Sequence, residues 1–293
     1  MNTNYKHVSP CTKLILYSGR EILASELKVG DILLSTESNE ERRITNIKTS
    51  KSQNYMFISR YCNSPFIINE NHYLPVILDT NYVLVNVKTY LSITNKSNIY
   101  LIRQSVDLNH IPITIEPYLL GIWFNNYNRN DQVLSFPKSN VTIILFLMSF
   151  LNKFDLEYED MEDDIIITDN RVVSQFENYG LFEDYSMIPD FIKYNNVITR
   201  QRFLAGFIDN NNTPEITITN KQMKDDICYI AHSIGLLTST KTSHKIWYTT
   251  ILYNNSQIIT NDFKVAKIPN DDCICLEITG TSPGILLADF TVI

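Results

Sequence analysis

The sequence predicts an α+β protein in which an all-β domain is split by an inserted domain of helices and strands. Short apolar strands separated by turns fill the N-terminal third, and β-type sequence returns at Cys273–Ile293. Between them, apolar stretches with helical periodicity occur in two similar series. An insertion of this kind is tolerated because lengthening an exposed loop costs little closure entropy. We therefore expect one domain over residues 1–115 and 263–293, and the other over residues 116–262.

The N-terminal part and the tail together carry the pattern of one compact β unit. The predicted N-terminal strands are Lys13–Tyr17, Ile32–Leu34, Arg43–Thr49, Tyr55–Arg60, Pro65–Ile68 and Tyr82–Val87. The tail adds strands at Cys275–Ile278 and Leu286–Val292, on either side of a turn at Gly280–Gly284. Short strands at this spacing are typical of an all-β unit.

After Pro117, the hydrophobic pattern changes from that of short strands to that of helices. The predicted helices are Tyr118–Phe124, Val141–Phe150, Arg171–Tyr179, Arg202–Ile208 and Gln222–Ile234. Strands are predicted at Ile165–Thr168 and Glu215–Thr219. Two copies of the order helix, strand, strand, helix fit this region as an internal pseudo-repeat. Because both copies lie in one chain, we expect a monomer with an internal pseudo-twofold axis.

The negative charge is concentrated in the middle of the chain. Residues 116–261 contain 11 Lys and Arg against 18 Asp and Glu, whereas the rest contains 14 of each kind. The run Glu157–Asp164 is the densest acidic segment, and we expect a solvated loop there. A surface that binds nucleic acid is normally basic, so any DNA binding by this region should be weak at physiological salt.

Cysteine usage and the N-terminus favour an intracellular protein of the cytoplasm or nucleus. The five cysteines are scattered and lack the spacing of a zinc site, so we expect reduced thiols. The polar segment Met1–Pro10 does not have the pattern of a secretory signal. No apolar run of roughly 18 residues is present, so we expect no membrane span.

Three ordered blocks in the β part resemble the splicing blocks of inteins, which have an all-β Hint domain shaped like a horseshoe. The opening block corresponds to Thr12–Gly19 followed by Ala24–Leu34. The second corresponds to Asn69–Val76, and the last to Cys275–Ile278 followed by Gly284–Ile293. Each block alone is common, but the three in order, at the two ends of the chain, form a specific combination.

The resemblance places the splicing nucleophile at a residue that cannot fill the role. In the family, the nucleophile lies five residues before the threonine that matches Thr12, which is His7 here. Splicing begins with attack by a thiol or hydroxyl on the preceding carbonyl, and His7 has neither group. Ser9 and Cys11 lie nearby but out of register. We therefore do not expect this chain to splice itself.

Two other positions of the splicing set remain. His72 matches the histidine that activates the N-terminal scissile bond, and Cys275 is a candidate helper thiol. In the family, a His-Asn pair follows the residue that matches Ile293, where this sequence stops. One alternative is therefore a protein-splicing element from which the first cysteine and the terminal His-Asn have been removed.

The inserted part resembles a two-motif LAGLIDADG (DOD-type) homing endonuclease, with an αββαββα pseudo-twofold fold. The motifs correspond to Leu119–Tyr127 and Leu204–Asn212. Small residues within them, Gly121, Ala205 and Gly206, would allow two helices to pack closely. In texture, the sequence is similar to the vacuolar-ATPase intein and the HO-type endonuclease. The Hint and endonuclease blocks together cover nearly the whole chain.

The resemblance also implies that the nuclease centre is degenerate. The family places a metal-binding carboxylate at the eighth position of each motif, and these positions are Asn126 and Asn211 here. Amides supply no net charge to hold Mg²⁺, the usual cofactor of the family. The family's catalytic lysine corresponds to Ser186. Asp209 matches a sixth position that packs rather than catalyses. In an active enzyme with displaced acids, the second alternative, Asp131 would be a candidate.

Double-stranded DNA is the partner that the resemblance implies. The candidate DNA-contacting residues are Arg129, Lys138, Lys221, Lys241, Lys245 and Tyr248. The preferred interpretation is an intein-derived, homing-endonuclease-like protein that is inactive as a hydrolase. A scaffold or DNA-binding factor without catalysis is a further alternative.

Overall fold

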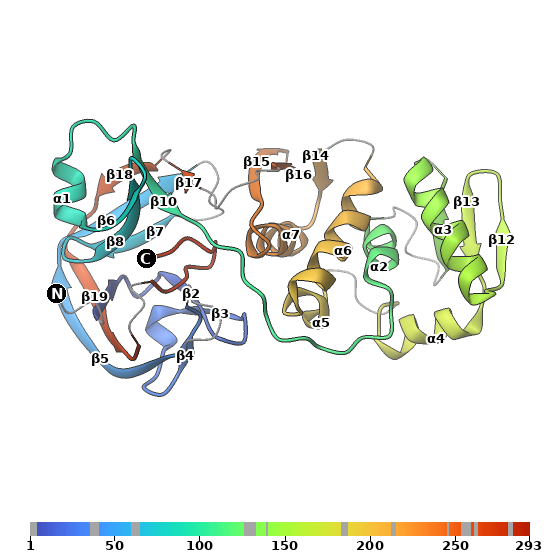
Figure 1. Cartoon of the computed structure of the whole chain (residues 1–293), viewed down its shortest axis with the longest axis horizontal. Helices are drawn as coiled ribbons and strands as arrows, with labels where there is room; N and C mark the ends of the chain where they lie inside the picture. Colours follow the sequence, from blue (N-terminus) through green and yellow to red (C-terminus); the bar gives the residue numbers. More distant parts are fainter. Residues whose placement is uncertain are drawn as a thin grey trace. The chain divides into compact units, whose positions relative to one another are not determined.

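The computed structural model shows a mixed α and β protein. It describes residues 5–35, 41–59, 65–125, 133–138, 140–182, 187–211, 215–244, 246–252, 259–260, 263–280 and 284–293. These residues form seven α-helices, one 3₁₀ helix and nineteen strands (Figure 1). None of the described helices has the length and hydropathy needed to cross a membrane.

The chain divides into two compact units, each built from segments that are separate in the sequence. The first unit comprises Met1–Leu108, His232–Ser239 and Tyr253–Ile293, and the second comprises Asn109–Ala231 and Thr240–Leu252. The boundaries predicted at 115/116 and 262/263 lie several residues from these, and no segment corresponding to 232–239 was predicted in the first unit.

Three sheets make up the first unit. Its strands are β1 (Tyr5–Val8), β2 (Lys13–Ile15), β3 (Glu21–Leu23), β4 (Ile32–Leu33), β5 (Arg42–Ser52), β6 (Asn54–Ser59), β7 (Phe66–Asn69), β8 (Tyr73–Leu78), β9 (Asn81–Asn86), β10 (Ile99–Ile102), β17 (Ile259–Thr260), β18 (Phe263–Lys267) and β19 (Asp271–Ile278). The sheet orders are β18-β6-β7-β1-β19-β5-β4, β17-β10-β8-β9 and β2-β3. A 3₁₀ helix (Ala24–Glu26) and α1 (Val87–Ser92) complete the unit.

The pairing of β1 with β19 joins the two ends of the sequence in one sheet. The strands are antiparallel over four residue pairs, from Tyr5↔Glu277 to Val8↔Ile274. Val8 and Leu276 are fully buried in the core of the unit. Side chains alternate between the two faces of a strand. The residues directly before Val8 on β1 and Leu276 on β19 therefore lie on the opposite face of the sheet or at its edge.

The tail departs from the predicted strand over Leu286–Val292. Leu286 and Val292 form only an isolated bridge to each other, and Phe290 between them has a positive φ of 62°. The backbone N–H of Phe290 donates to the carbonyl of Leu287 at 2.8 Å, which closes a tight turn. The prediction of a continuous strand was wrong because this turn folds the segment back on itself.

The second unit contains two halves that share the order helix, strand, helix, strand, strand, with one further helix after the first series and another before the second. The first half is α2 (Pro117–Phe124), β11 (Leu134–Pro137), α3 (Val141–Phe154), β12 (Tyr158–Asp160), β13 (Asp164–Ile167) and α4 (Asn170–Asn178). The second half is α5 (Asp190–Lys193), α6 (Val197–Asp209), β14 (Glu215–Ile218), α7 (Lys221–Ser233), β15 (Leu237–Ser243) and β16 (Ile246–Leu252). The sheets β11-β13-β12 and β14-β16-β15 have matching strand orders.

The internal repeat therefore runs helix, strand, helix, strand, strand over the described residues. The predicted order of helix, strand, strand, helix differs, because a helix follows the first strand of each sheet. Residues 126–132 and 212–214, which precede these first strands, lie outside the described part of the chain.

Side-chain caps explain where several of these helices begin. The Glu116 carboxylate accepts the backbone N–H of Leu119 at 2.7 Å at the start of α2, where Pro117 is the first helical residue. Asn140 and Asn196 cap α3 and α6 in the same way, through Thr142 and Thr199. Asn140 lies directly before the apolar stretch from which α3 was predicted, whereas α6 begins at Val197, five residues before its predicted start at Arg202.

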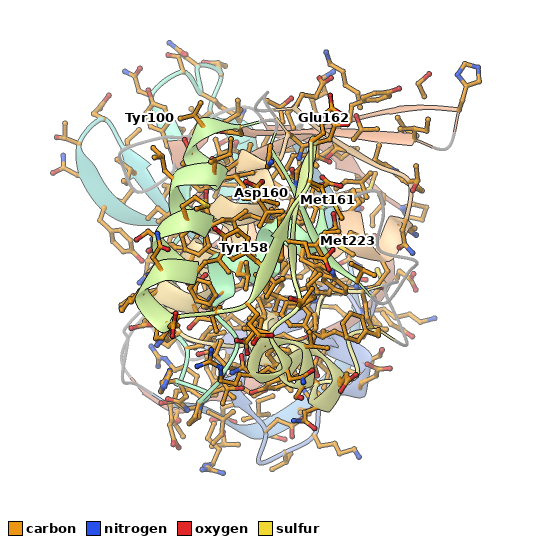
Figure 2. The ribbon with its side chains drawn as sticks, turned by 90° about the vertical axis from the view of Figure 1, so that its right-hand side faces the viewer. Tyr100, Tyr158, Asp160, Met161, Glu162 and Met223 are labelled. Atoms are coloured by element: carbon orange, nitrogen blue, oxygen red, sulfur yellow. The ribbon has the colours of Figure 1, made fainter. Side chains whose placement is uncertain are left out.

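The acidic run Glu157–Asp164 is a β-hairpin rather than the loop that we predicted. Strand β12 pairs with β13, with Tyr158 opposite Ile167. Figure 2 labels Tyr158, Asp160, Met161 and Glu162 along this hairpin. The apolar segment that follows the acids supplies the pairing strand, so the hairpin forms despite the exposed carboxylates.

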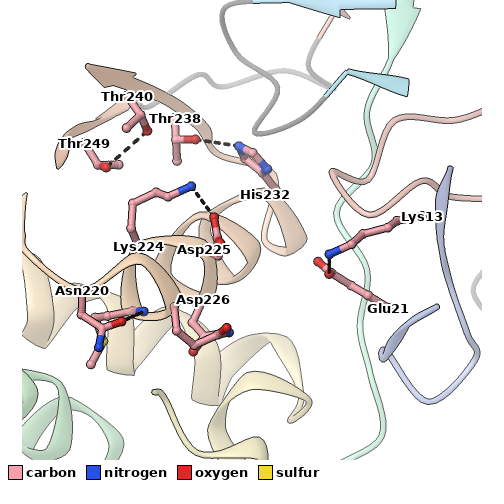
Figure 3. Close-up of polar contacts among 12 residues, drawn as sticks. Lys13, Glu21, Asn220, Lys224, Asp225, Asp226, His232, Thr238, Thr240 and Thr249 are labelled. Carbon is pink, nitrogen blue, oxygen red and sulfur yellow. Dashed lines mark hydrogen bonds and ion pairs between the residues drawn. The ribbon is translucent and has the colours of Figure 1, made fainter. Parts of the chain in front are cut away.

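The β15–β16 hairpin had no counterpart in the prediction. Its hydroxyl groups form the contact Thr240 Oγ1 to Thr249 Oγ1, 3.3 Å, and His232 Nε2 lies 2.8 Å from Thr238 Oγ1 at the end of α7 (Figure 3). Strand β15 is rich in threonine and serine, so it lacks the apolar alternation that identifies a strand in a sequence; β16 is mostly apolar and was also not predicted.

Candidate functional site

The β1–β19 pair places two of the predicted splicing residues side by side. His7 lies directly opposite Cys275 in the strand register. The Sγ atom of Cys275 is 4.0 Å from Nε2 of His7. Both side chains are partly exposed, so a thiol and an imidazole meet at the edge of the core.

A turn after β7 brings His72 to the same place. The Asn69 side chain accepts the backbone N–H of Asn71 at 2.9 Å, and the N–H of His72 donates to the Asn69 carbonyl at 3.2 Å. His72 is completely buried. Its Nδ1 accepts the backbone N–H of His7 at 3.1 Å, so the imidazole contacts the peptide bond between Lys6 and His7.

This hydrogen bond defines the protonation state of His72. A peptide N–H can only donate, so Nδ1 is an acceptor and the neutral ring carries its proton on Nε2. Burial holds the pKa of His72 well below its usual value, and the nearby Lys6 and His7 lower it further. Among the described residues, Nε2 of His72 and Nδ1 of His7 are buried without a hydrogen-bond partner.

Lys6 contributes a buried cation beside these histidines. Its side chain is 2% exposed, and its Nζ donates to the carbonyl oxygen of Ile293 at 2.8 Å. Burial lowers the pKa of Lys6 to about 7, with a further contribution from Arg42. The pKa of His7 is also lowered, by burial first and by Lys6 second. Burial first, and the neighbouring basic groups second, therefore lower the pKa of all three side chains and favour their neutral forms.

The thiols of the C-terminal strand are poorly ionised. Burial raises the pKa of Cys275, although Lys48 counteracts it. Burial also raises the pKa of Cys273, whose Sγ lies 3.4 Å from the Asn69 amide. A thiol is nucleophilic as its thiolate, so neither cysteine is activated in this environment.

Thr12 has a structural role next to the cluster. Its hydroxyl donates to the carbonyl of Ile67 at 2.7 Å, and the Ser9 backbone N–H donates to the same carbonyl at 3.0 Å. The Ser9 hydroxyl and the exposed Cys11 thiol lie 3.2 Å apart on the turn after β1. They contact each other rather than the His7 peptide bond.

The second unit has its own site-forming feature, the crossing of α2 and α6. A Cβ atom added to Gly121 would lie 2.1 Å from the Phe203 carbonyl oxygen, and one added to Gly206 would lie 2.1 Å from that of Tyr118. The two helices therefore touch backbone to backbone, and only glycine fits at the contact. Gly121 and Tyr118 correspond to Gly206 and Phe203 in the repeat, so each contact is the twofold mate of the other.

Reciprocal contacts between α2 and α6 continue at the ends of the two helices. The Asn125 amide donates to the Phe207 carbonyl at 2.7 Å, and the equivalent Asn210 amide donates to the Ile122 carbonyl at 3.3 Å. Asn211 also donates to the Phe207 carbonyl, at 3.2 Å. The Asn125 and Asn210 amides therefore link the ends of the two helices, whereas the Asn211 amide binds within the end of its own helix.

Few acids are available for a metal at this position. The Asp209 carboxylate accepts the Tyr118 hydroxyl at 2.6 Å, and burial together with this contact raises the pKa of Tyr118. Asn126 and Ser186, the other nuclease positions, lie outside the described residues. Within the described part of the chain, no group of three His, Cys, Asp or Glu residues could hold a metal.

The structure describes four of the six candidate DNA-contacting residues. Lys138 is engaged by the acidic hairpin, through an ion pair with Asp160 and a hydrogen bond to the Met161 carbonyl. Lys221 begins α7, and Lys241 and Tyr248 lie on β15 and β16. Arg129 and Lys245 lie outside the described residues.

Sequence reasoning did not find Lys6, Asn69 or the Ile293 carbonyl as parts of the site. The only local signal for Lys6 is its place in β1, where every second residue is buried. Its partner is 287 residues away, and the contact depends on the pairing of the two chain ends.

Comparison with known proteins gives limited similarity. No family model matches the sequence. The solved structures similar to this chain include the gp41-1 intein, with 20% identity and a TM-score of 0.26, covering 34% of this chain and 69% of that chain. A variant of the gp41-1 intein with three substitutions gives 20% identity, a TM-score of 0.27 and the same coverage. Similarity at this level is too low to establish a shared fold or activity.

Proposed function

We propose that the first unit is a Hint-type splicing module, as in inteins, directed at the peptide bond between Lys6 and His7 and lacking its nucleophile. One observation carries the proposal: Nδ1 of the buried His72 accepts the backbone N–H of His7 at 3.1 Å. An imidazole in this position can activate the bond by interacting with the departing nitrogen. The chain also supplies the other neighbours of a splicing site, with Cys275 and the Ile293 carbonyl close to the same strand.

The identity of residue 7 explains why the module would be inactive. An acyl shift moves the carbonyl of the preceding residue from nitrogen to a thiol or hydroxyl, and His7 offers neither. The Cys275 thiol is nearby, but its raised pKa keeps it protonated near neutral pH. The positioning machinery is therefore present without the reacting group.

The His7→Cys substitution tests this proposal. In this variant, the new thiol attacks the Lys6 carbonyl carbon, the carbon–nitrogen bond breaks, and the amine takes the proton. Added dithiothreitol then captures the thioester and separates residues 1–6 from the remainder. We expect dithiothreitol-dependent scission after Lys6 within hours, measured by denaturing mass spectrometry, and none in the unaltered chain.

A second substitution separates assisted chemistry from non-specific thiol cleavage. We expect His72→Ala in the His7→Cys background to slow scission at least about tenfold, in the range of one general acid–base residue. The pair Lys13→Met and His7→Cys, altered at an exposed lysine, should cleave normally. Absence of thioester in a folded His7→Cys protein would contradict the proposal.

We propose, separately, that the second unit is a LAGLIDADG-type endonuclease scaffold that no longer cuts DNA. Gly121 contacts the backbone of α6 and Gly206 contacts the equivalent backbone of α2, and these matching contacts support a helix pair with internal twofold symmetry. The amide of Asn211 is bound to a carbonyl, and the acidic hairpin engages Lys138. The ligand would be double-stranded DNA, bound weakly, and the internal pairing favours a monomer. Metal-dependent cleavage should therefore return only when acids are restored.

A further inference from the structure

The carbonyl oxygen of Ile293 lies in a cradle of two donors. Nζ of Lys6 donates to it at 2.8 Å, and the backbone N–H of Ile285 donates to it at 3.0 Å. Ile293 also donates its own N–H to the Ile285 carbonyl at 2.9 Å. All three residues are buried, so water does not compete for this oxygen.

A buried lysine at this position has a cost that calls for a functional explanation. Transferring an ammonium group from water into a protein interior is unfavourable unless it is well paired. Lys6 is nevertheless on the core side of β1, one residue from the peptide N–H that contacts His72. The groups that face it are the Ile293 carbonyl and the nearby Arg42, His7 and His72.

The strand that carries Lys6 pairs with β19 over four residue pairs but pairs much less with its other neighbour, β7. β1 is four residues long and contacts β7 through a single pair, Val8↔Ile68. The Lys6 side chain adds a tether from this strand to the segment 285–293. That segment is independently held by the buried ion pair between Arg103 and Asp289, 2.7 Å.

We propose that Lys6 is a positioning residue that couples the two ends of the splicing site. Its side chain docks on the Ile293 carbonyl, and this contact holds the Lys6–His7 peptide bond against His72 only while the segment 285–293 is in place. The module therefore requires a residue with a long, hydrogen-bond-donating side chain immediately before the peptide bond that it acts on. This inference rests on the proposed function, but the tether itself can be tested without any chemistry.

Hydrogen exchange of the otherwise unaltered chain tests the tether. Lys6→Met keeps the length of the side chain and removes its donor, whereas Lys6→Arg keeps a cationic donor. We expect Lys6→Met to raise amide exchange at Ile285, Ile293 and His7 about tenfold, and Lys6→Arg to raise it less. The control is Lys13→Met, which removes an exposed lysine paired with Glu21 at 3.0 Å (Figure 3), and it should change none of these amides.

The chemical consequence is measured in the His7→Cys background. We expect Lys6→Met to slow dithiothreitol-dependent scission about tenfold, and Lys6→Arg to recover part of the rate. Unchanged exchange at the three amides in a folded Lys6→Met protein overturns the coupling, whatever the scission assay gives. If His7→Cys gives no scission but the exchange increases, the proposed function fails and the tether stands. If exchange increases while scission is unchanged, the positioning role is overturned.

Discussion

Lys6 gives the molecule a specific dependence of stability on pH. Its pKa is lowered to about 7 in the folded protein, by burial first and by Arg42 second, from an ordinary value of 10.5. Between these values, the unfolded chain binds a proton that the folded chain does not, so the free energy of unfolding rises with pH across this window. We expect Lys6→Met to reduce the slope by up to about 1.4 kcal/mol per pH unit between pH 7 and 10.5. Urea titrations over this range check it, and slopes that match the unaltered chain would refute it.

The residues of the site differ in how far the sequence alone revealed them. His7, His72 and Cys275 were selected because each occupies a position in an ordered block, and the structure places them within one cluster. Lys6 was missed because its importance comes from a carbonyl at the other end of the chain. A backbone acceptor carries no sequence signal, so no motif could have identified it.

The crossing of α2 and α6 depends on its two glycines. Gly121→Ala would place a Cβ 2.1 Å from a backbone oxygen, which cannot move aside as a side chain can. We expect a loss of about 3 kcal/mol or more in the free energy of unfolding, at the upper end of overpacking effects. Gly180→Ala is the control, because a Cβ there meets no atom within 4 Å but the backbone φ is +65°. It should cost only about 1 kcal/mol. Equal losses in denaturant titrations would show that close packing is not the cause.

At the level of elements, apolar periodicity predicted helices well and polar strands poorly. The helices α3 and α7 were predicted as Val141–Phe150 and Gln222–Ile234, and their observed bounds differ by a few residues. β15 was missed because it consists mainly of threonine and serine, whereas β16 was missed although most of its residues are apolar. The tail strand was predicted wrongly because tertiary contacts stabilise a turn at a residue, Phe290, that has no turn propensity.

For the whole molecule, restoring three residues tests whether the second unit descends from a nuclease. We expect the combination of Asn126→Asp, Asn211→Asp and Ser186→Lys to nick supercoiled DNA with Mg²⁺ or Mn²⁺ more readily than any single substitution, because two carboxylates and a cation act as one centre. A gel shift at several salt concentrations is the control for binding. If the triple variant binds DNA but does not cut it, the assigned positions are wrong. If it does not bind, the acidic surface prevents recognition.

The pairing of β1 with β19 has a consequence for any cut after Lys6. In the His7→Cys variant, Tyr5 and Lys6 would remain in the sheet, opposite Glu277 and Leu276, after the Lys6 acyl group had moved from the backbone nitrogen of residue 7 to its sulfur. The new amine would then stay beside the acyl group at a high effective molarity, so the bond would reform unless another nucleophile removed the acyl group. Breaking the peptide bond at this site is therefore reversible while the protein stays folded. A thiol that captures the acyl group determines whether the six residues leave.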